Sequence, residues 1–428
     1  MAAFAYANAQ SIKYLDKLID VTQDYTILAN KIKFDKEARQ GSSIRCPVAL
    51  TRCYGFTPGG TTPAATSLAT PEPTLFRYAE VSANENALSQ LVPIGDVFRN
   101  EGGEVSFINT SKDIPARMAA SAGARLDDEI LYGRSPVAAV SDIAASTTGD
   151  PVGGAHGGTF TVDAASWRDG FWFASEQMLI DLFTLTSSAT AENVSPIKIT
   201  TVNDAPGSRV VGFSCASGDV AAIEAMTTGF AYYRSVKTGA ATFNQMLGMY
   251  ESLSVTSGSV FNIPVTFSGW KGRTIAAGGA ELSINLLNQA TARLAGIGLK
   301  KNLIALVSTK GWIDLMDDMA ALRAVDYSYN SKNLVTGSES LTFHGLNQGK
   351  VEVIAHPAVK WSDAFVIDPE SWIRGGSTEW TFDVPGYDNA SGRVPGTNYI
   401  EVFAYTDQCL LSKMLSHNVL ITGLDSSL

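Results

Sequence analysis

The chain has 428 residues, a formal net charge of −10 and a charged fraction of only 17%. The length predicts two to three domains' worth of chain, and the acidic balance excludes a protein that wraps nucleic acid with a basic surface. Typical globular proteins have about 25% charged residues. The low value suggests a surface covered by other copies of the chain, although an ordinary protein rich in Ala, Gly, Ser and Thr would have the same composition.

The cysteines and the lengths of the apolar runs indicate in which cellular compartment the chain is expected. Cys46, Cys53, Cys215 and Cys409 form no CxxC pair, and such a thinly spread set is typical of a reducing compartment. The N-terminus has no basic region followed by an apolar core and a cleavage site. No apolar run reaches the roughly 18 residues of a membrane span. We therefore expect a soluble, cytosolic chain that does not enter a membrane.

The first hundred residues predict a helix, a strand and an irregular tract. Apolar residues at helical spacing predict a helix over Ser11–Phe34, and Ser43–Leu50 alternates weakly, like a strand. Gly55–Thr74 then places prolines among threonine, alanine and glycine, a composition that cannot build a core. We interpret this tract as an extended arm or a mobile loop.

Val105–Asn109 and Thr159–Val162 are expected strands at the two ends of a long excursion, which begins basic and becomes glycine-rich. The excursion predicts either a projecting β-hairpin, which needs a neighbouring surface, or a small subdomain with a helix at Ala124–Leu131. The aromatic residues that follow should anchor a core rather than form a ligand cage. They are Trp167, Phe171, Trp172 and Phe173.

The segment Asp219–Leu253 predicts one long helix. Ile223, Met226 and Phe230 begin a helical spacing, and Ser217 or Asp219 is a credible N-cap. Its interior glycines, each costing about 1 kcal/mol relative to alanine, would allow a bend. Thr184–Ser208, before it, has β or loop character and is interpreted as an insertion.

The last third predicts an α/β layer followed by strands. An apolar strand lies between two amphipathic helices and is expected to be buried. The elements are helix Gly279–Ile297, strand Leu303–Ser308, helix Gly311–Leu322, strands Leu341–Phe343, Val351–Ile354 and Ala364–Ile367, and a long closing strand Tyr399–Thr422.

The sequence contains no motif that predicts catalysis. The four histidines have no metal-ligand spacing, no GxSxG serine occurs, and GIGLKK and FSGWKGRT do not match phosphate loops. Asp314, Asp317 and Asp318 place three carboxylates on one helix, which could hold a divalent cation. A solvated face, or a patch facing another subunit, is the favoured interpretation, and the acidic run Asp127 to Glu129 is interpreted in the same way. We expect no catalytic, cofactor or metal site.

Several sequence segments in the last third, taken in their order, resemble the major capsid proteins of tailed bacteriophages. GGAELSINLLNQATARLAG precedes LIALVSTKGWIDLMDDMAALR, which is similar to that family's strand and "W..L" helix, here with Trp312, Leu315 and Arg323. LTFHGLNQGKVEVIAHPAV and WSDAFVIDPESW are similar to the phrases that follow in the family. YIEVFAYTDQCLLSKMLSHNVLITG resembles its closing segment.

The resemblance implies an α+β fold, the tailed-phage major capsid protein fold, with an N-terminal arm, an extended β-hairpin loop, a peripheral domain with a long spine helix, and an axial domain. The implied boundaries follow the chain. They are an arm over 1–100, the extended loop over 101–165, a peripheral domain over 166–279 with its spine helix at 219–253 and an insertion at 184–208, an axial domain over 280–398, and a closing strand over 399–428 that returns to the peripheral domain.

The function that the resemblance implies is assembly, not enzymatic activity. Identical subunits would form hexamers and pentamers of an icosahedral shell that encloses phage double-stranded DNA without sequence-specific contact. The location would be the virion capsid, assembled in the host bacterial cytoplasm. Implied partners are further copies of the chain, a separate scaffolding protein, a portal protein and, as a further candidate, a decoration protein. No residues match a covalent crosslinking site.

One pairing of surfaces is a hypothesis from charge alone. Arg117, Arg125 and Arg134 of the basic excursion would meet Asp314, Asp317 and Asp318 of a neighbouring subunit. Three rival functions remain open at this point: an encapsulin-like nanocompartment shell, a tail-tube or surface-layer protein, and an α/β enzyme with an unusual site.

Overall fold

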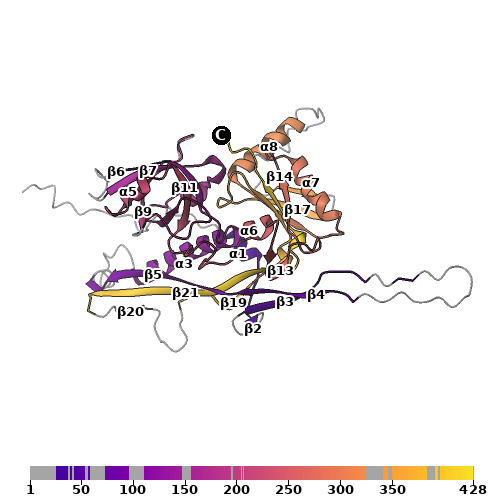
Figure 1. Cartoon of the computed structure of the whole chain (residues 1–428), viewed down its shortest axis with the longest axis horizontal. Coiled ribbons are helices and arrows are strands. Elements are labelled where there is room, and N and C mark those ends of the chain that lie inside the picture. The colour runs from indigo at the N-terminus through magenta and orange to yellow at the C-terminus, as the bar shows by residue number, and fades with distance from the viewer. Residues whose placement is uncertain are drawn as a thin grey trace, which may run out of the picture.

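The computed structural model has two bodies joined by long strands (Figure 1). It describes residues 26–36, 39–40, 43–53, 56–57, 73–95, 110–146, 156–193, 196–203, 205, 207–323, 341–345, 349–382, 391–393 and 396–427. Val105–Asn109 and most of Ser11–Phe34 and Gly55–Thr74 lie outside these ranges. Among the helices within them, none is both long and apolar enough to cross a membrane.

The first body is a mixed six-stranded sheet with the order β14-β22-β18-β15-β17-β16. In that order the strands are Arg273–Ala276, Val419–Thr422, Ala364–Ile367, Leu303–Val307, Lys350–Ala355 and Leu341–His344. Helices α7 (Ile284–Ala295) and α8 (Thr309–Arg323) lie beside it (Figure 1). The predicted order of two helices around one strand, with three strands after them, is confirmed.

Strand β15 is buried on both faces because its side chains alternate between two cores. Ala305 and Val307 pack in one cluster with the apolar stripes of α7 and α8. Ile304 and Leu306 join the cluster that also contains the C-terminal half of the longest strand. A strand covered on both faces has a continuous apolar sequence, and this explains the run LIALV.

The second body is a closed barrel with the order β10-β7-β6-β11-β8-β9. In chain order its strands are β6 Ala138–Ser146, β7 His156–Val162, β8 Leu179–Phe183, β9 Ile197–Asn203, β10 Val210–Cys215 and β11 Thr228–Tyr233. Trp167, Phe171 and Trp172 are buried in the same core cluster as the barrel strands, as predicted. Phe173 is exposed and does not take part.

A long helix and two strand ribbons connect the bodies. Helix α3 (Thr110–Leu131) has 22 residues and packs against α1 (Ile27–Lys31) and the longest strand. That strand, β21 (Tyr399–Ser412), pairs along one edge with β5 (Asn84–Pro93). Its other edge pairs with β19 and β20, which are Trp372–Thr381 and Ser391–Arg393.

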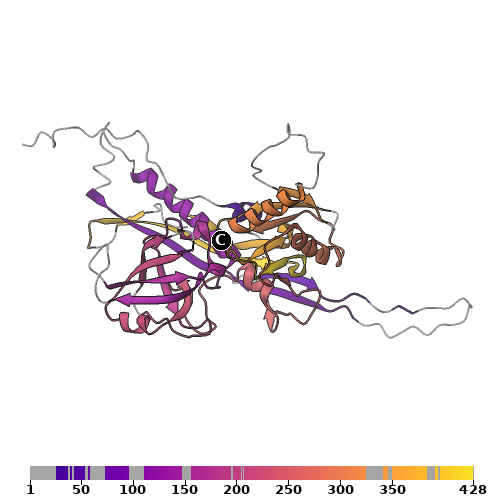
Figure 2. The same cartoon turned by 90° about the horizontal axis from the view of Figure 1, so that it is seen from above.

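The two ribbons project in opposite directions. The hairpin of β3 (Ser43–Ala49) and β4 (Phe76–Ser82) extends past the sheet body, whereas the free ends of β5, β20 and β21 extend below the barrel (Figures 1 and 2). The predicted strand at Ser43–Leu50 is confirmed as β3. The predicted tract Gly55–Thr74 follows β3 in the chain, and only a few of its residues are described.

The predicted spine helix over Asp219–Leu253 is wrong. The segment forms a short helix α5 (Val220–Glu224), barrel strand β11 and a second short helix α6 (Met249–Ser254). The apolar spacing at the start of the segment fits a helix, but the run TGFAYY is rich in aromatic residues that favour strands. Gly229 also lies in β11, where a β-carbon would come within 2.8 Å of the Phe183 carbonyl oxygen. The long helix of the described chain is α3, about 33 Å in length.

Three further boundary predictions are wrong. The described part of 101–165 is helix α3 followed by barrel strands rather than an extended hairpin, and a projecting hairpin is formed by β3 and β4, inside the predicted arm. Thr184–Ser208 contributes strand β9 to the barrel and is not an insertion into it. The closing strand Tyr399–Thr422 is interrupted by a short 3-10 turn at Leu415–His417, and its two parts, β21 and β22, enter different sheets.

Candidate functional site

The two faces of the β3–β4 hairpin differ in chemistry. One face carries Ile44 and Ala79, which are buried in the core shared with the sheet body. The other face carries Phe76 and Tyr78, which are 64% and 63% exposed. Large apolar side chains that gather on an exposed face mark an interaction surface. We call the face with Phe76 and Tyr78 the outer hairpin face.

Strand pairing fixes the remaining members of the outer hairpin face. Phe76 and Tyr78 lie opposite Ala49 and Pro47 of β3, so small apolar residues surround both rings. The next pair along the hairpin is charged: Arg45 lies 2.9 Å from Glu80. A hydrogen bond from Ser43 and the Arg45 charge lower the pKa of Glu80. The face is therefore apolar toward its tip and ionic toward its root.

The ribbon of β5 and β21 offers a different kind of surface. Within the described residues, β5 pairs with β21 alone, which leaves ten residues of strand with one edge open. Open edges present N–H and C=O groups to another chain. Leu91 and Tyr399 lie on the same face of this ribbon and are 56% and 43% exposed. Edge and face together suit contact with another extended segment.

A buried polar cluster at the end of α3 connects this helix to α1, to β5 and to both bodies. Asp127 is fully buried and accepts hydrogen bonds from the backbone N–H groups of Leu28 and Ala29, at 2.9 and 2.7 Å. The His356 Nε2 atom lies 3.2 Å from the same carboxylate. A single side chain thus connects α1, α3 and the loop after β17. Such a carboxylate is tolerable in the interior because both of its oxygens accept hydrogen bonds.

Asp128, the next residue, joins α3 to the barrel. Its carboxylate pairs with Arg168, whose side chain is fully buried, and accepts a hydrogen bond of 2.8 Å from the Tyr233 hydroxyl. The Arg168 guanidinium also donates to the Val137 carbonyl oxygen at 2.9 Å. These groups come from α3, the segment before β6, the segment after β7, and β11. The ion pair therefore fixes the barrel on the helix.

The third part of the cluster joins α3 to the sheet body. The Tyr132 hydroxyl donates to Asp363 at 3.1 Å and accepts from the Lys360 backbone N–H at 2.9 Å. Burial raises the pKa of Asp363 to about 6 and lowers the pKa of Lys360 to about 8. The Lys360 ammonium donates to the Pro136 carbonyl oxygen at 2.9 Å and lies 4.6 Å from the centre of the Tyr132 ring. Between these two pKa values both groups are charged in the interior.

The acidic run Asp127 to Glu129 is therefore not the solvated or intersubunit face that its sequence suggests. Its three side chains are between 0% and 4% exposed. Glu129 accepts hydrogen bonds from Arg125 and Asn86, both at 3.0 Å, and burial raises its pKa. Consecutive acidic residues point in different directions around a helix, so each reaches a different neighbouring element. The sequence signal that could have revealed this is the apolar residue at each side of the run, Leu126 and Ile130.

Of the three arginines predicted at an interface, two lie largely inside the subunit. Arg125 stacks 3.0 Å from the centre of the Tyr233 ring in addition to its pair with Glu129. Arg134 lies 5.8 Å from the centre of the Phe243 ring. Arg117, near the start of α3, is exposed.

The three aspartates on α8 that were predicted at an interface also differ in their surroundings. Asp314 pairs with Lys310 at 3.0 Å, one turn earlier. Asp318 accepts a hydrogen bond of 3.0 Å from the backbone N–H of Ile284 and so caps the start of α7. Asp317 is exposed. The structure does not bring the arginines and aspartates together, because the former lie on and after α3 and the latter on α8. The exposed residues Phe76, Tyr78 and Leu91 are the surface that sequence reasoning missed.

Comparison with solved structures decides the fold. No family model matches the chain, and no curated protein matches it at a significant level. A capsid chain of cyanophage A-1(L) superposes with a TM-score of 0.53 at 10% identity, and the match covers 98% of both chains. The capsid chain of a native GTA particle superposes with a TM-score of 0.51 at 8% identity, covering 99% of this chain and 100% of that one.

The chain has the tailed-phage major capsid protein fold. The superposition includes the barrel, the sheet body and both ribbons, because almost the entire length is covered in each case. The capsid fold therefore holds although the predicted place of its spine helix and extended hairpin was wrong. Within the described residues, the longest helix is α3 and the projecting hairpin is β3–β4.

Proposed function

We propose that this chain is a major capsid protein, which self-assembles into hexamers and pentamers of an icosahedral shell around phage double-stranded DNA. The observation that carries the proposal is the capsid fold over 98% of the chain. The outer hairpin face and the open edge of β5 support it, because both leave binding groups unused in a single subunit. The role is structural rather than enzymatic, and the place of the protein is the virion capsid, after assembly in the cytoplasm of the host.

A rigid body with projecting ribbons suits a shell. Subunits of such a shell meet at slightly different angles, and the packed bodies resist deformation whereas a hairpin can pivot at its root. Several weak contacts made together give a stable lattice through avidity. DNA would be enclosed without sequence-specific contact, which agrees with the net charge of −10.

Other contacts follow from the same proposal. Arg117 and Asp317 are the exposed members of the charge pairing that the sequence suggested, and they would meet across a subunit boundary. A separate scaffolding protein and a portal protein would act during assembly, and a decoration protein could bind the outer surface.

Electron microscopy of the purified full-length protein tests the proposal. We expect closed shells, or hexameric and pentameric rings, after concentration at moderate salt. Tubes, planar lattices or a monodisperse monomer under all conditions would refute it. Shells that form around an enzyme encoded beside this gene would indicate the encapsulin-like alternative instead.

A further inference from the structure

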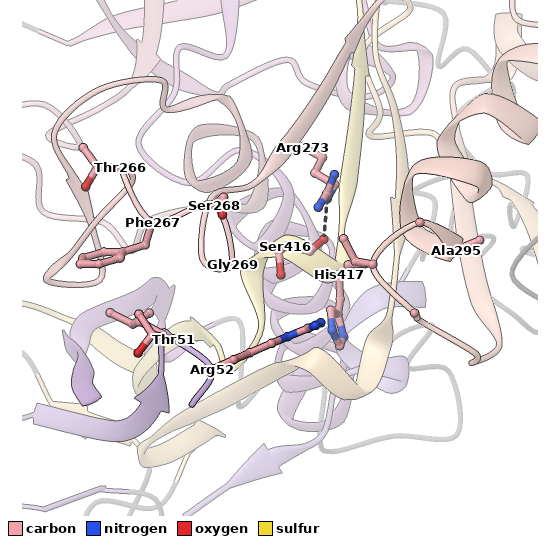
Figure 3. A pocket seen from close by; sticks show the side chains of 14 residues that line it. Thr51, Arg52, Thr266, Phe267, Ser268, Gly269, Arg273, Ala295, Ser416 and His417 are labelled. Atoms are coloured by element: carbon pink, nitrogen blue, oxygen red, sulfur yellow. Dashed lines mark hydrogen bonds between the residues drawn. The ribbon is translucent and has the colours of Figure 1, made fainter. Parts of the chain in front are cut away.

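A pocket of about 950 Å³ lies where the segment that follows β3, on the tip side of the hairpin, meets the sheet body. Four short segments enclose it: residues 50–52 after β3, the turn 266–269, the end of α7 at 295–298, and the turn 416–417 before β22. Figure 3 shows Arg52 extending across the pocket toward His417, with Arg273 above Ser416. Pockets of this volume are typical of small-molecule sites.

The pocket is basic although the protein is acidic. Its lining includes Arg52, Arg273 and His417 and contains no aspartate or glutamate. Hydroxyl groups of Thr51, Thr266, Ser268 and Ser416 belong to the same lining (Figure 3). Arginine forks and hydroxyl donors in one concave site are the groups that recognise a multiply charged oxyanion.

In the part of the chain that the structure describes, no carboxylate lines the pocket beside its arginines. The Arg273 Nε atom donates to the Ser416 carbonyl oxygen at 3.3 Å, and a nitrogen of Arg293 donates to the Thr274 carbonyl oxygen at 2.6 Å. Burial and the positive charge of Arg293 lower the pKa of Arg273. Among the described residues, the acidic neighbour of His417 is Asp368, which lies 3.6 Å away and outside the lining. An anion bound to Arg273 would offset the electrostatic repulsion between Arg273 and Arg293.

We propose that this pocket binds a phosphate group, with Arg52 and Arg273 as its charged ligands and the surrounding hydroxyls as neutral donors. Two arginines and four hydroxyls exceed what a single carboxylate can use, whereas phosphate offers more acceptor oxygens and a higher charge. The C-terminal end of α7 carries a partial negative charge on its last carbonyl groups, which disfavours a bound anion. This effect is weaker than the charge-assisted hydrogen bonds from the arginines. The phosphate can belong to a free phosphate compound or to the backbone of enclosed DNA.

Binding at this place would act on the hairpin. Arg52 follows β3, while Arg273 begins β14 and Ser416 precedes β22. A phosphate held by groups from both sides would join the segment after β3 to the sheet body and restrict the direction of the hairpin. The proposal concerns binding by the single subunit, so it stands or fails independently of shell formation.

Isothermal titration calorimetry of the full-length subunit, purified without phosphate, tests the site with inorganic phosphate and pyrophosphate. We expect saturable binding, tighter for pyrophosphate, and a Kd raised about tenfold by Arg52→Ala, which removes one charge-assisted contact. Arg273→Lys keeps the charge and should weaken binding less. The matched control is Arg45→Ala, since Arg45 is an exposed arginine of the hairpin that pairs with Glu80 away from the pocket. This variant should bind like the wild type.

Competition identifies the source of the phosphate. Displacement of pyrophosphate by a short single-stranded oligonucleotide assigns the site to the DNA backbone, and its failure assigns it to a free phosphate compound; both support the proposal. Absence of saturable binding, or equal loss in the Arg52 and Arg45 variants, would overturn it. Glutarate that binds as tightly as pyrophosphate would also overturn it, in favour of a carboxylate site.

Discussion

The Tyr132 hydroxyl donates a hydrogen bond of 3.1 Å to the Asp363 carboxylate, although 231 residues separate the two in the chain. Tyr132 follows the last turn of α3, and Asp363 immediately precedes β18. The bond thus connects the helix between the bodies to the centre of the six-stranded sheet. Because both side chains are buried, the protonation of Asp363 is tied to the stability of the subunit.

Replacing Asp363 should change how stability depends on pH. The folded pKa is about 6, above the ordinary value of 3.8. Between these values the folded chain binds a proton that the unfolded chain does not, so this group stabilises the subunit as the pH falls through about 6 toward about 4. Asp363→Asn should lose that component. The measurement is the difference in urea midpoint between wild type and variant at several pH values in this range.

Other carboxylates contribute to the wild-type curve with the opposite sign, which is why the difference matters. Glu80→Gln serves as control, because the pKa of Glu80 is lowered. The Glu80→Gln variant should lose the part of the free energy of unfolding that the Glu80 carboxylate contributes at higher pH and that the wild type loses as the pH falls. Parallel curves for Asp363→Asn and wild type would contradict the prediction.

Removing Arg168 should uncouple the barrel from α3. Arg168→Met leaves the Asp128 charge buried without its cation, and breaking one side of a buried ion pair costs about 3–5 kcal/mol. Asp128→Asn with Arg168→Met removes both charges and should be less destabilising than Arg168→Met alone. Chemical denaturation of the two singles and the double gives the coupling energy. Additive effects would show that the pair makes no specific contribution.

Polar substitutions on the outer hairpin face should affect assembly but not folding. Phe76→Ser and Tyr78→Ser change exposed side chains, so the free energy of unfolding should move by less than about 0.5 kcal/mol. The yield of shells should fall severalfold, since each subunit would lose apolar contact area at every such interface. Phe173→Ser, an exposed aromatic residue beside the barrel, is the matched control. Sedimentation separates shells from free subunits, and unchanged yields with the hairpin variants would exclude this face from assembly.

The acidic residues of α8 should behave differently from one another. Asp318→Ala removes the cap on the Ile284 N–H and should destabilise the subunit by about 1 kcal/mol. Asp317→Ala should leave thermal unfolding unchanged and reduce shell yield if Asp317 faces a neighbour. A loss of stability in the Asp317 variant, or none in the Asp318 variant, would reverse these roles.

The part of the fold that the sequence predicted well is the sheet body. Short, strongly patterned elements such as LIALV and the α7 stripe are set by local periodicity, so their types and order follow from the residues themselves. Helix α3 was missed except for its last turns, because its first half contains Pro115 and many small residues with little apolar contrast. The segment Asp219–Leu253 failed for the opposite reason: its spacing fits a helix, but barrel pairing of β11 on both edges outweighed it.

The candidate surfaces could be predicted only in part. The sequence located acidic and basic residues, but whether Asp127 or Asp317 faces solvent depends on which elements pack around each helix. Phe76 and Tyr78 look like ordinary strand residues in the sequence. Their exposure follows from the hairpin having one face against the core while, among the described residues, no further layer covers the other face.

What the sequence by itself determined is an acidic, low-charge composition, the order of elements in the sheet body, and segments that resemble those of phage capsid proteins. Tertiary structure alone decided where the long helix α3 and the projecting β3–β4 hairpin lie, and which charges are buried. The physical reason is range. Periodicity and composition report contacts within a few turns. The barrel joins strands that are tens of positions apart, and the cluster around Tyr132 and Asp363 and the basic pocket beside the hairpin join residues that are hundreds of positions apart.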